Sequence, residues 1–182
     1  AQNFTSSTIY INTSTSVTTL VPFNWYNIIV TTTSGITTDN PFYIARRSTN
    51  YFNGQISDVR IYDHALTAEQ VKDIYFNQTI LETEILHYKF NEKMGTTAFD
   101  SSGNEYDGTL TYGPIYYLSN PYRNYAMSFN GSNNYVSIPN PSTDLSGHLT
   151  ISLWVKRNNT DTNQTLICKD LDMEFQVYFL SY

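Results

Sequence analysis

The chain has 182 residues, which suits one domain with a sizeable core and is too short for a large multidomain enzyme. Charged residues are only 14% of the sequence while aromatic residues reach 15%, a composition typical of β-rich proteins. The net charge is −6 and the ten Lys and Arg are scattered, so we do not expect nucleic acid as a partner. No apolar run approaches the roughly 18 residues that span a bilayer, so we expect no membrane span.

Short segments of alternating apolar and polar residues recur along the chain, separated by Asn-Gly, Ser-Gly and Asn-Pro turns. In the clearest segment, Leu149, Ile151 and Leu153 share one face and Trp154 lies on the other. Many short strands at even spacing predict an all-β fold, an antiparallel jelly-roll β-sandwich. The predicted strands are 24–31, 42–45, 56–62, 85–90, 125–129, 135–138, 148–155 and 175–180.

One short helix is predicted near 67–75. Thr67 as N-cap and Gln70 three residues later form a capping box. Leu66 and Val71 stand where the two apolar residues of a hydrophobic staple are found. We therefore expect a helix of about two turns.

Two groups of side chains are candidate sugar-binding residues. Tyr43 and Arg46 lie close together in the sequence, as do Tyr116 and Tyr117. A sugar ring presents C–H groups to an aromatic face and hydroxyls to amides, so Tyr among Asn residues favours glycan binding. Tyr is also a favoured strand residue, and ordinary packing is the alternative explanation.

The turn at 100–108 is rich in oxygen ligands of the kind that Ca²⁺ prefers, with Asp100 and Asp107 as candidate ligands. The spacing of the two carboxylates does not match an EF-hand. The alternative is a polar turn in which Asp100 accepts hydrogen bonds from backbone amides.

Asn-x-Ser/Thr sequons occur along the whole chain and permit N-glycosylation where host and compartment allow it. A sequence so rich in Asn, Ser and Thr produces several such triplets by chance. The sequons begin at Asn3, Asn12, Asn77, Asn130, Asn158 and Asn163.

The stretch 51–71 reads Tyr-Phe-Asn-Gly-Gln-Ile-Ser-Asp-Val-Arg-Ile-Tyr-Asp-His-Ala-Leu-Thr-Ala-Glu-Gln-Val. It resembles the C-terminal signature of laminin-G-like jelly rolls of the concanavalin A superfamily. The segments 86–92, 99–104, 126–136 and 150–156 are similar to the N-terminal half of the same family. The resemblance implies a concanavalin A-like sandwich, a lectin-like function and, as in related jelly rolls, a cation that fixes a loop.

The two half-signatures occur in inverted order. Residues 1–79 resemble the family's C-terminal half and residues 80–182 its N-terminal half. Two explanations stay open: the chain is a window cut from a tandem array of repeats, or it is a circular permutant. In either case the strand ending at 180 is expected to continue into 8–11, so that both halves close one sandwich. About a dozen family residues, including one strand, are absent after Ser34-Gly35.

The resemblance, with no convincing catalytic set beside it, indicates a non-catalytic lectin-like or adhesive module, displayed outside a cell or on a virus-like particle. The expected partners are glycans or cell-surface glycoproteins and neighbouring copies of the chain itself. The expected cofactor is at most Ca²⁺. The alternative is a structural spacer or filament-forming subunit without a ligand.

A second alternative is a retaining glycoside hydrolase. Asp170, Asp172 and Glu174 resemble the Glu-x-Asp-x-Glu strand of β-glucanases with the same fold. By that resemblance, Asp170 and Glu174 would be the two working carboxyl groups. A solvated edge or turn is the alternative explanation for these acids.

Overall fold

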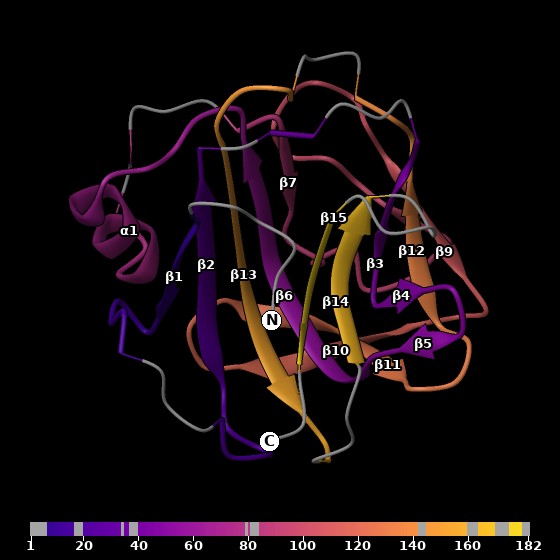
Figure 1. The fold of residues 1–182 in the computed structure, drawn as a ribbon. Helices are drawn as coiled ribbons and strands as arrows, with labels where there is room; N and C mark the ends of the chain where they lie inside the picture. Colours follow the sequence, from indigo (N-terminus) through magenta and orange to yellow (C-terminus); the bar gives the residue numbers. More distant parts are fainter. Residues whose placement is uncertain are drawn as a thin grey trace.

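The protein is a sandwich of two antiparallel β-sheets, with helix α1 (Ala68–Tyr75) on the outer side of one of them (Figure 1). The structure is a computed structural model, and it describes residues 7–16, 20–33, 35–36, 40–78, 80, 84–141, 145–159, 164–169 and 175–179. The all-β sandwich with a single short helix is the fold predicted from the sequence.

The larger sheet has seven strands. Its strand order is β1-β2-β13-β6-β11-β10, and β7 pairs separately with β6. The strands are β1 (Ser7–Ile11), β2 (Tyr26–Thr32), β13 (Leu149–Arg157), β6 (Asn53–Tyr62), β11 (Asn124–Asn130), β10 (Ile115–Asn120) and β7 (Leu86–Tyr88).

The second sheet has six strands in the order β15-β14-β3-β12-β9-β8, and β4 and β5 form a separate pair. The strands of the six-stranded sheet are β15 (Phe175–Phe179), β14 (Gln164–Lys169), β3 (Phe42–Ile44), β12 (Tyr135–Ile138), β9 (Gly108–Thr111) and β8 (Thr97–Ala98). The small pair is β4 (Arg46–Arg47) and β5 (Asn50–Tyr51).

Each sheet contains strands from both segments of the chain, 1–79 and 80–182. In the larger sheet β13 lies between β2 and β6, and in the smaller one β3 lies between β14 and β12. Apolar residues of both segments form one buried cluster between the sheets, to which Ile44, Leu153 and Val136 belong. Neither segment could therefore bury its apolar face without strands of the other.

Helix α1 is held by the capping box predicted for it. The backbone N–H of Gln70 donates to Oγ1 of Thr67 at 3.3 Å, and the backbone N–H of Thr67 donates to Oε1 of Gln70 at 2.7 Å. Leu66 and Val71 are both buried, in a small apolar cluster between the helix and the outer side of the larger sheet. The cap fixes where the helix begins, and the cluster fixes which side of the sheet it covers.

The predicted strand 148–155 shows the expected alternation. Leu149, Ile151 and Leu153 belong to the cluster between the sheets. Trp154 is fully buried on the opposite side of the sheet, where the rings of Tyr75 and Tyr122 cover it. β13 is thus buried on both faces, although its sequence alternates as in a half-exposed strand.

One expected strand continuation is wrong. β1 pairs with β2, Ile9 lying opposite Val30, at one edge of the larger sheet. β15 pairs with β14, at one edge of the other sheet. The segment 8–11 does not extend the strand that contains Val177, because the two strands lie in different sheets. Between β2 and β3, the described residues contain no strand, in agreement with the short connection noted after Ser34-Gly35.

Candidate functional site

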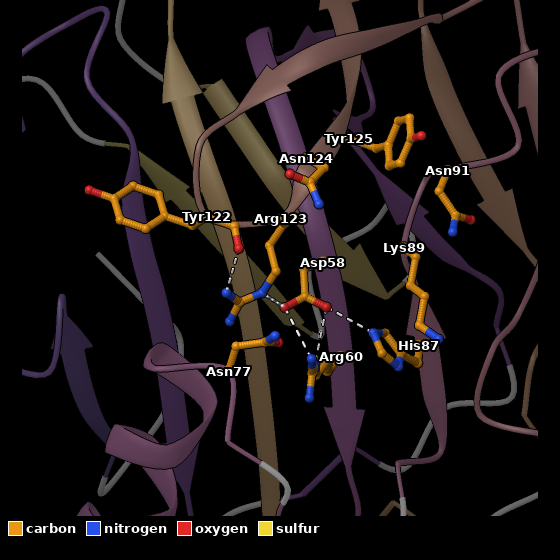
Figure 2. A pocket seen from close by; sticks show the side chains of 10 residues that line it. All are labelled: Asp58, Arg60, Asn77, His87, Lys89, Asn91, Tyr122, Arg123, Asn124 and Tyr125. Carbon is orange, nitrogen blue, oxygen red and sulfur yellow. Dashed lines mark hydrogen bonds and ion pairs between the residues drawn. The ribbon is translucent and has the colours of Figure 1, made fainter.

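Along one edge, β6 pairs with two different strands in succession, β11 and then β7, which separate from each other. β11 pairs with β6 as far as Met127 opposite Ile56, and β7 begins to pair at Tyr88 opposite Val59. The division leaves a cavity of about 240 Å³, which we call the fork hollow. Figure 2 shows its lining side chains, which come from β6, the segment after α1, β7 and the segment after it, and the β10–β11 hairpin. They are Asp58, Arg60, Asn77, His87, Lys89, Asn91, Tyr122, Arg123, Asn124 and Tyr125.

Asp58 lies at the division, in a β-bulge. The register between β6 and β13 shifts by one residue between Ser152 and Trp154, so β6 contains one extra residue there. Asp58 has a φ of 49°, the left-handed conformation that such an extra residue can require. Ile56 and Val59 face the core on either side of the bulge, and Asp58 is thereby directed outward toward the hollow.

The Asp58 carboxylate is the centre of an ion cluster, drawn with dashed lines in Figure 2. Arg60 donates to its two oxygens at 3.0 and 3.2 Å, and Arg123 donates from Nε at 2.6 Å. Nε2 of His87 lies 2.8 Å from Oδ1. An ionised carboxylate only accepts hydrogen bonds, so His87 donates through Nε2. Of these contacts, only the one between Asp58 and Arg60 joins near neighbours in the sequence, which an i, i+2 spacing on a strand predicts.

Asp58 is ionised in this cluster. Burial by itself raises the pKa of a carboxyl group, but the hydrogen bond from His87 and the charges of Arg60, His87 and Arg123 outweigh it, and the pKa of Asp58 lies well below its usual range. Only 4% of the side chain is exposed. The carboxylate is thus a fixed structural anion whose oxygens are occupied by protein donors.

Arg123 joins the hairpin to the helix. Its Nη2 donates to the carbonyl of Ile74 at 2.5 Å and its Nη1 to the carbonyl of Tyr122 at 2.9 Å. The ring of Tyr122 stacks on Trp154 with 4.2 Å between the centroids and 19° between the planes. The guanidinium of Arg123 also lies 5.3 Å from the Trp154 ring. These contacts hold the hairpin wall of the fork hollow in place.

Four lining side chains make no hydrogen bond or ion pair in the described part of the chain. Asn77, Asn91 and Asn124 are exposed amides, and Lys89 is an exposed ammonium group. Tyr125 adds a partly buried ring at the rim. The hollow therefore has a rigid ionic floor and polar groups around it that can bind a ligand.

The first predicted aromatic group lies elsewhere. Arg46 lies over the rings of Tyr43, Tyr51 and Tyr135, its guanidinium carbon 4.4 Å from the Tyr135 centroid. The rings of Tyr43 and Tyr135 meet edge to face at 6.0 Å. Arg46 thus occupies the space that these rings enclose, and none of these side chains lines the fork hollow.

The second predicted group lies in the larger sheet, whereas Tyr43 is in the six-stranded sheet. Tyr116 is in β10, packs against the core and donates its hydroxyl to the carbonyl of Thr97 at 2.8 Å. Burial, with a contribution from Glu92, raises the pKa of Tyr116 to about 12. The side chain of Tyr117 falls outside the described residues. Tyr116 and Tyr43 therefore do not share one binding surface.

The turn that was a candidate calcium site is ordered by Asp100. Its carboxylate accepts hydrogen bonds from the amides of His87, Ser102 and Tyr106 and from the Ser102 hydroxyl. Asp107 in turn accepts from the Asp100 amide at 2.8 Å. Both Asp100 oxygens accept hydrogen bonds from N–H or O–H donors, an arrangement that does not fit a bound cation. The described residues contain no cluster of three or more acidic, His or Cys side chains that could hold a metal ion.

The acids of the hydrolase alternative, Asp170, Asp172 and Glu174, lie outside the described residues, as do the sequon residues Asn3 and Asn163. The other four sequon residues are described. Amide groups of three of them are used within the protein: Asn12 accepts from Asn27, Asn130 caps its own turn, and Asn158 donates to Asn53. Only Asn77, among these four, is exposed with no bonded amide, and it lines the fork hollow.

Comparison with known families supports the resemblance seen in the sequence. Residues 5–72 match the family model Laminin_G_3, described as the concanavalin A-like lectin/glucanases superfamily. The segment that contains β1 to β6 and most of α1 is therefore laminin-G-like, and the whole structure is a sandwich consistent with that fold. Neither a search of curated proteins nor a search of solved structures found a match. No described helix is long and apolar enough to cross a membrane.

Sequence reasoning did not find the fork hollow. No local pattern links His87 or Arg123 to Asp58, because they are 29 and 65 positions from it. The only local signal was the pair of opposite charges at Asp58 and Arg60 in a segment otherwise read as a strand.

Proposed function

We propose that the chain is a non-catalytic, lectin-like β-sandwich module that binds carbohydrate in the fork hollow. The observation that carries the proposal is the set of exposed, unbonded amides of Asn77, Asn91 and Asn124 around one cavity. Sugar hydroxyls donate and accept hydrogen bonds, and an amide offers both partners. Tyr125 lines the same cavity, and its partly buried ring can face sugar C–H groups.

The size of the hollow favours a short ligand. Its volume of about 240 Å³ is below the roughly 300–1,000 Å³ of pockets that bury drug-sized molecules. One or two sugar rings at a chain end or branch match this volume better than a long glycan groove does. We propose glycans or cell-surface glycoproteins as the source of such rings.

The chemistry of the hollow favours binding over hydrolysis. A retaining glycoside hydrolase needs two carboxyl groups about 5–5.5 Å apart, one of which gives up a proton. Among the described residues, Asp58 is the one carboxylate that lines the hollow. Since Arg60, Arg123 and His87 hold it ionised, it cannot donate a proton to a leaving group.

We place the module outside a cell or on a particle surface. Laminin-G-like domains are often extracellular, and the sequon that begins at the exposed Asn77 would be glycosylated only in a compartment that carries out that reaction. A glycan on Asn77 would extend from the rim of the hollow, so binding is best measured on protein from a host that does not glycosylate.

A glycan-array screen, run in Ca²⁺ and in EDTA, tests the proposal. We expect reproducible binding to a subset of short glycans, lost in the double variant Asn91→Ala, Asn124→Ala. Asn24→Ala is the matched control, because Asn24 is exposed, makes no hydrogen bond in the described part of the chain and does not line the hollow.

Two results would overturn the proposal. No binding to any glycan on the array, together with concentration-dependent assembly in sedimentation, would favour a structural spacer or filament-forming subunit. Release of free sugar by the wild-type chain, lost in Glu174→Gln, would favour the hydrolase.

A further inference from the structure

The fork hollow is positively charged in an acidic protein. Three of its lining residues, Arg60, Lys89 and Arg123, are cations, and the carboxylates of Asp58 and Glu84 pair with the two arginines. The chain as a whole has a net charge of −6. A local excess of positive charge in a concave site attracts an anionic ligand.

The two arginines cannot themselves bind that ligand directly. Arg60 uses Nε and Nη2 on Asp58 and Nη1 on Glu84. Arg123 uses Nε on Asp58 and both terminal nitrogens on backbone carbonyls. Their side chains are 12% and 9% exposed, and the carboxylates of Asp58 and Glu84 balance their two charges, so the net positive charge of the hollow is that of Lys89.

Lys89 is the cation that remains available. It follows β7, it is exposed, and no described residue bonds its ammonium group. Figure 2 shows Lys89 and Asn91 on one side of the hollow, with Asn124 and Arg123 on the hairpin side. An anionic group bound to Lys89 would therefore lie beside amide donors.

Resting on the proposed sugar binding, we propose that the ligand of the fork hollow is a sugar that bears one carboxylate, as in a uronic or sialic acid, and that Lys89 binds this carboxylate. The ammonium group would donate to the carboxylate oxygens in a charge-assisted hydrogen bond. The free amides of Asn91 and Asn124 would bind the ring hydroxyls.

A single charge fits the site better than a polyanionic chain. A sulfated polymer needs a row of free cations, and the remaining cations of the hollow are already bound to Asp58, Glu84 and backbone carbonyls. One free ammonium group matches one carboxylate.

The test compares acidic sugars with their own neutral esters. Glucuronate, galacturonate and N-acetylneuraminate are each titrated calorimetrically beside the corresponding methyl ester, which keeps the ring and removes the charge. For at least one pair we expect the free acid to bind tenfold or more tightly, because a hydrogen bond between charged groups is strong. Lys89→Gln should abolish this preference.

The control variant is Lys72→Gln. Lys72 is exposed on α1, lies outside the fork hollow, and its replacement changes the net charge by the same amount. We expect it to keep the preference for the acid. Circular dichroism of both variants confirms that each is folded.

The outcomes separate this inference from the proposed function. If neutral sugars bind in the hollow and acid and ester bind alike, or if the preference survives Lys89→Gln, the carboxylate inference is wrong and sugar binding stands. Preferential binding of a sulfated disaccharide also overturns it. If no acidic or neutral sugar binds at all, both proposals are wrong.

Discussion

Nε of Arg123 donates to Oδ2 of Asp58 at 2.6 Å, although the two residues are 65 positions apart. Both side chains are buried, 9% and 4% exposed. The same guanidinium binds the carbonyl of Ile74 near the end of α1. This one ion pair therefore links the bulge of β6, the β10–β11 hairpin and the helix, and it sets the shape of the hollow between them.

Removing Asp58 should destabilise the protein strongly. Asp58→Ala leaves Arg60 and Arg123 facing each other without their shared anion, and breaking a buried ion pair in this way costs about 3–5 kcal/mol. The measurement is urea unfolding followed by circular dichroism. Asp63→Ala is the control: Asp63 is 47% exposed and, among the described residues, pairs only with His64, so its loss should change stability by less than about 1 kcal/mol. Equal effects of the two substitutions would contradict the role given to Asp58.

Acid should destabilise the protein through Asp58. Its folded pKa is lowered below the unfolded value of 3.8, so its contribution to stability is fully present at neutral pH. The contribution is lost as pH falls below about 4, where the unfolded chain takes up a proton that the native carboxylate does not. The free energy of unfolding, measured from pH 7 to pH 3, should decline less steeply in Asp58→Asn than in the wild type. Parallel declines would show that other carboxyl groups account for the acid sensitivity.

Truncating Tyr122 should expose Trp154. Tyr122→Ala removes a ring stacked 4.2 Å from the indole, at a cost of about 1–2 kcal/mol, and admits water to the indole face. We expect a red shift of tryptophan emission, measured in a Trp25→Phe background so that Trp154 alone reports. Tyr112→Ala is the control, because Tyr112 is 70% exposed and its ring stacks on no described residue. An unshifted spectrum in Tyr122→Ala would mean that the stack does not shield Trp154 in solution.

The turn at Asp100 should respond to substitution and not to calcium. Asp100→Ala leaves the amides of His87, Ser102 and Tyr106 without their acceptor, and we expect a loss of about 2 kcal/mol. The melting temperature should be the same in Ca²⁺ and in EDTA. A rise in Ca²⁺ that disappears in Asp100→Ala would support the calcium site expected from the sequence instead.

Much of the fold could be predicted because its signals are local. Alternation identified β13, β12 and β11 to within about two residues of their ends. The capping box at Thr67 and Gln70 fixed the start of α1. Strands with weak or very short patterns, such as β4, β5 and β8, were not predicted, since two residues carry no readable period.

The site was less predictable because it depends on pairings between distant segments. Nothing near Asp58 in the sequence shows that β6 has an extra residue there; the bulge exists only in the register with β13. The expected continuation from the strand ending at 180 into 8–11 failed for a similar reason. Both segments are edge strands in the structure, and the sequence does not say which sheet each edge belongs to.

The sequence by itself determined the strands with a clear alternating pattern, where the helix begins and that Asp58 and Arg60 lie close enough to pair, because each depends on neighbours a few positions away. The tertiary structure decided that His87 and Arg123 complete the cluster and that Lys89 and three amides stand open around it. Those positions follow from where β7 and β11 leave β6, and strand pairing over such separations is fixed by burial of the shared core rather than by any local pattern.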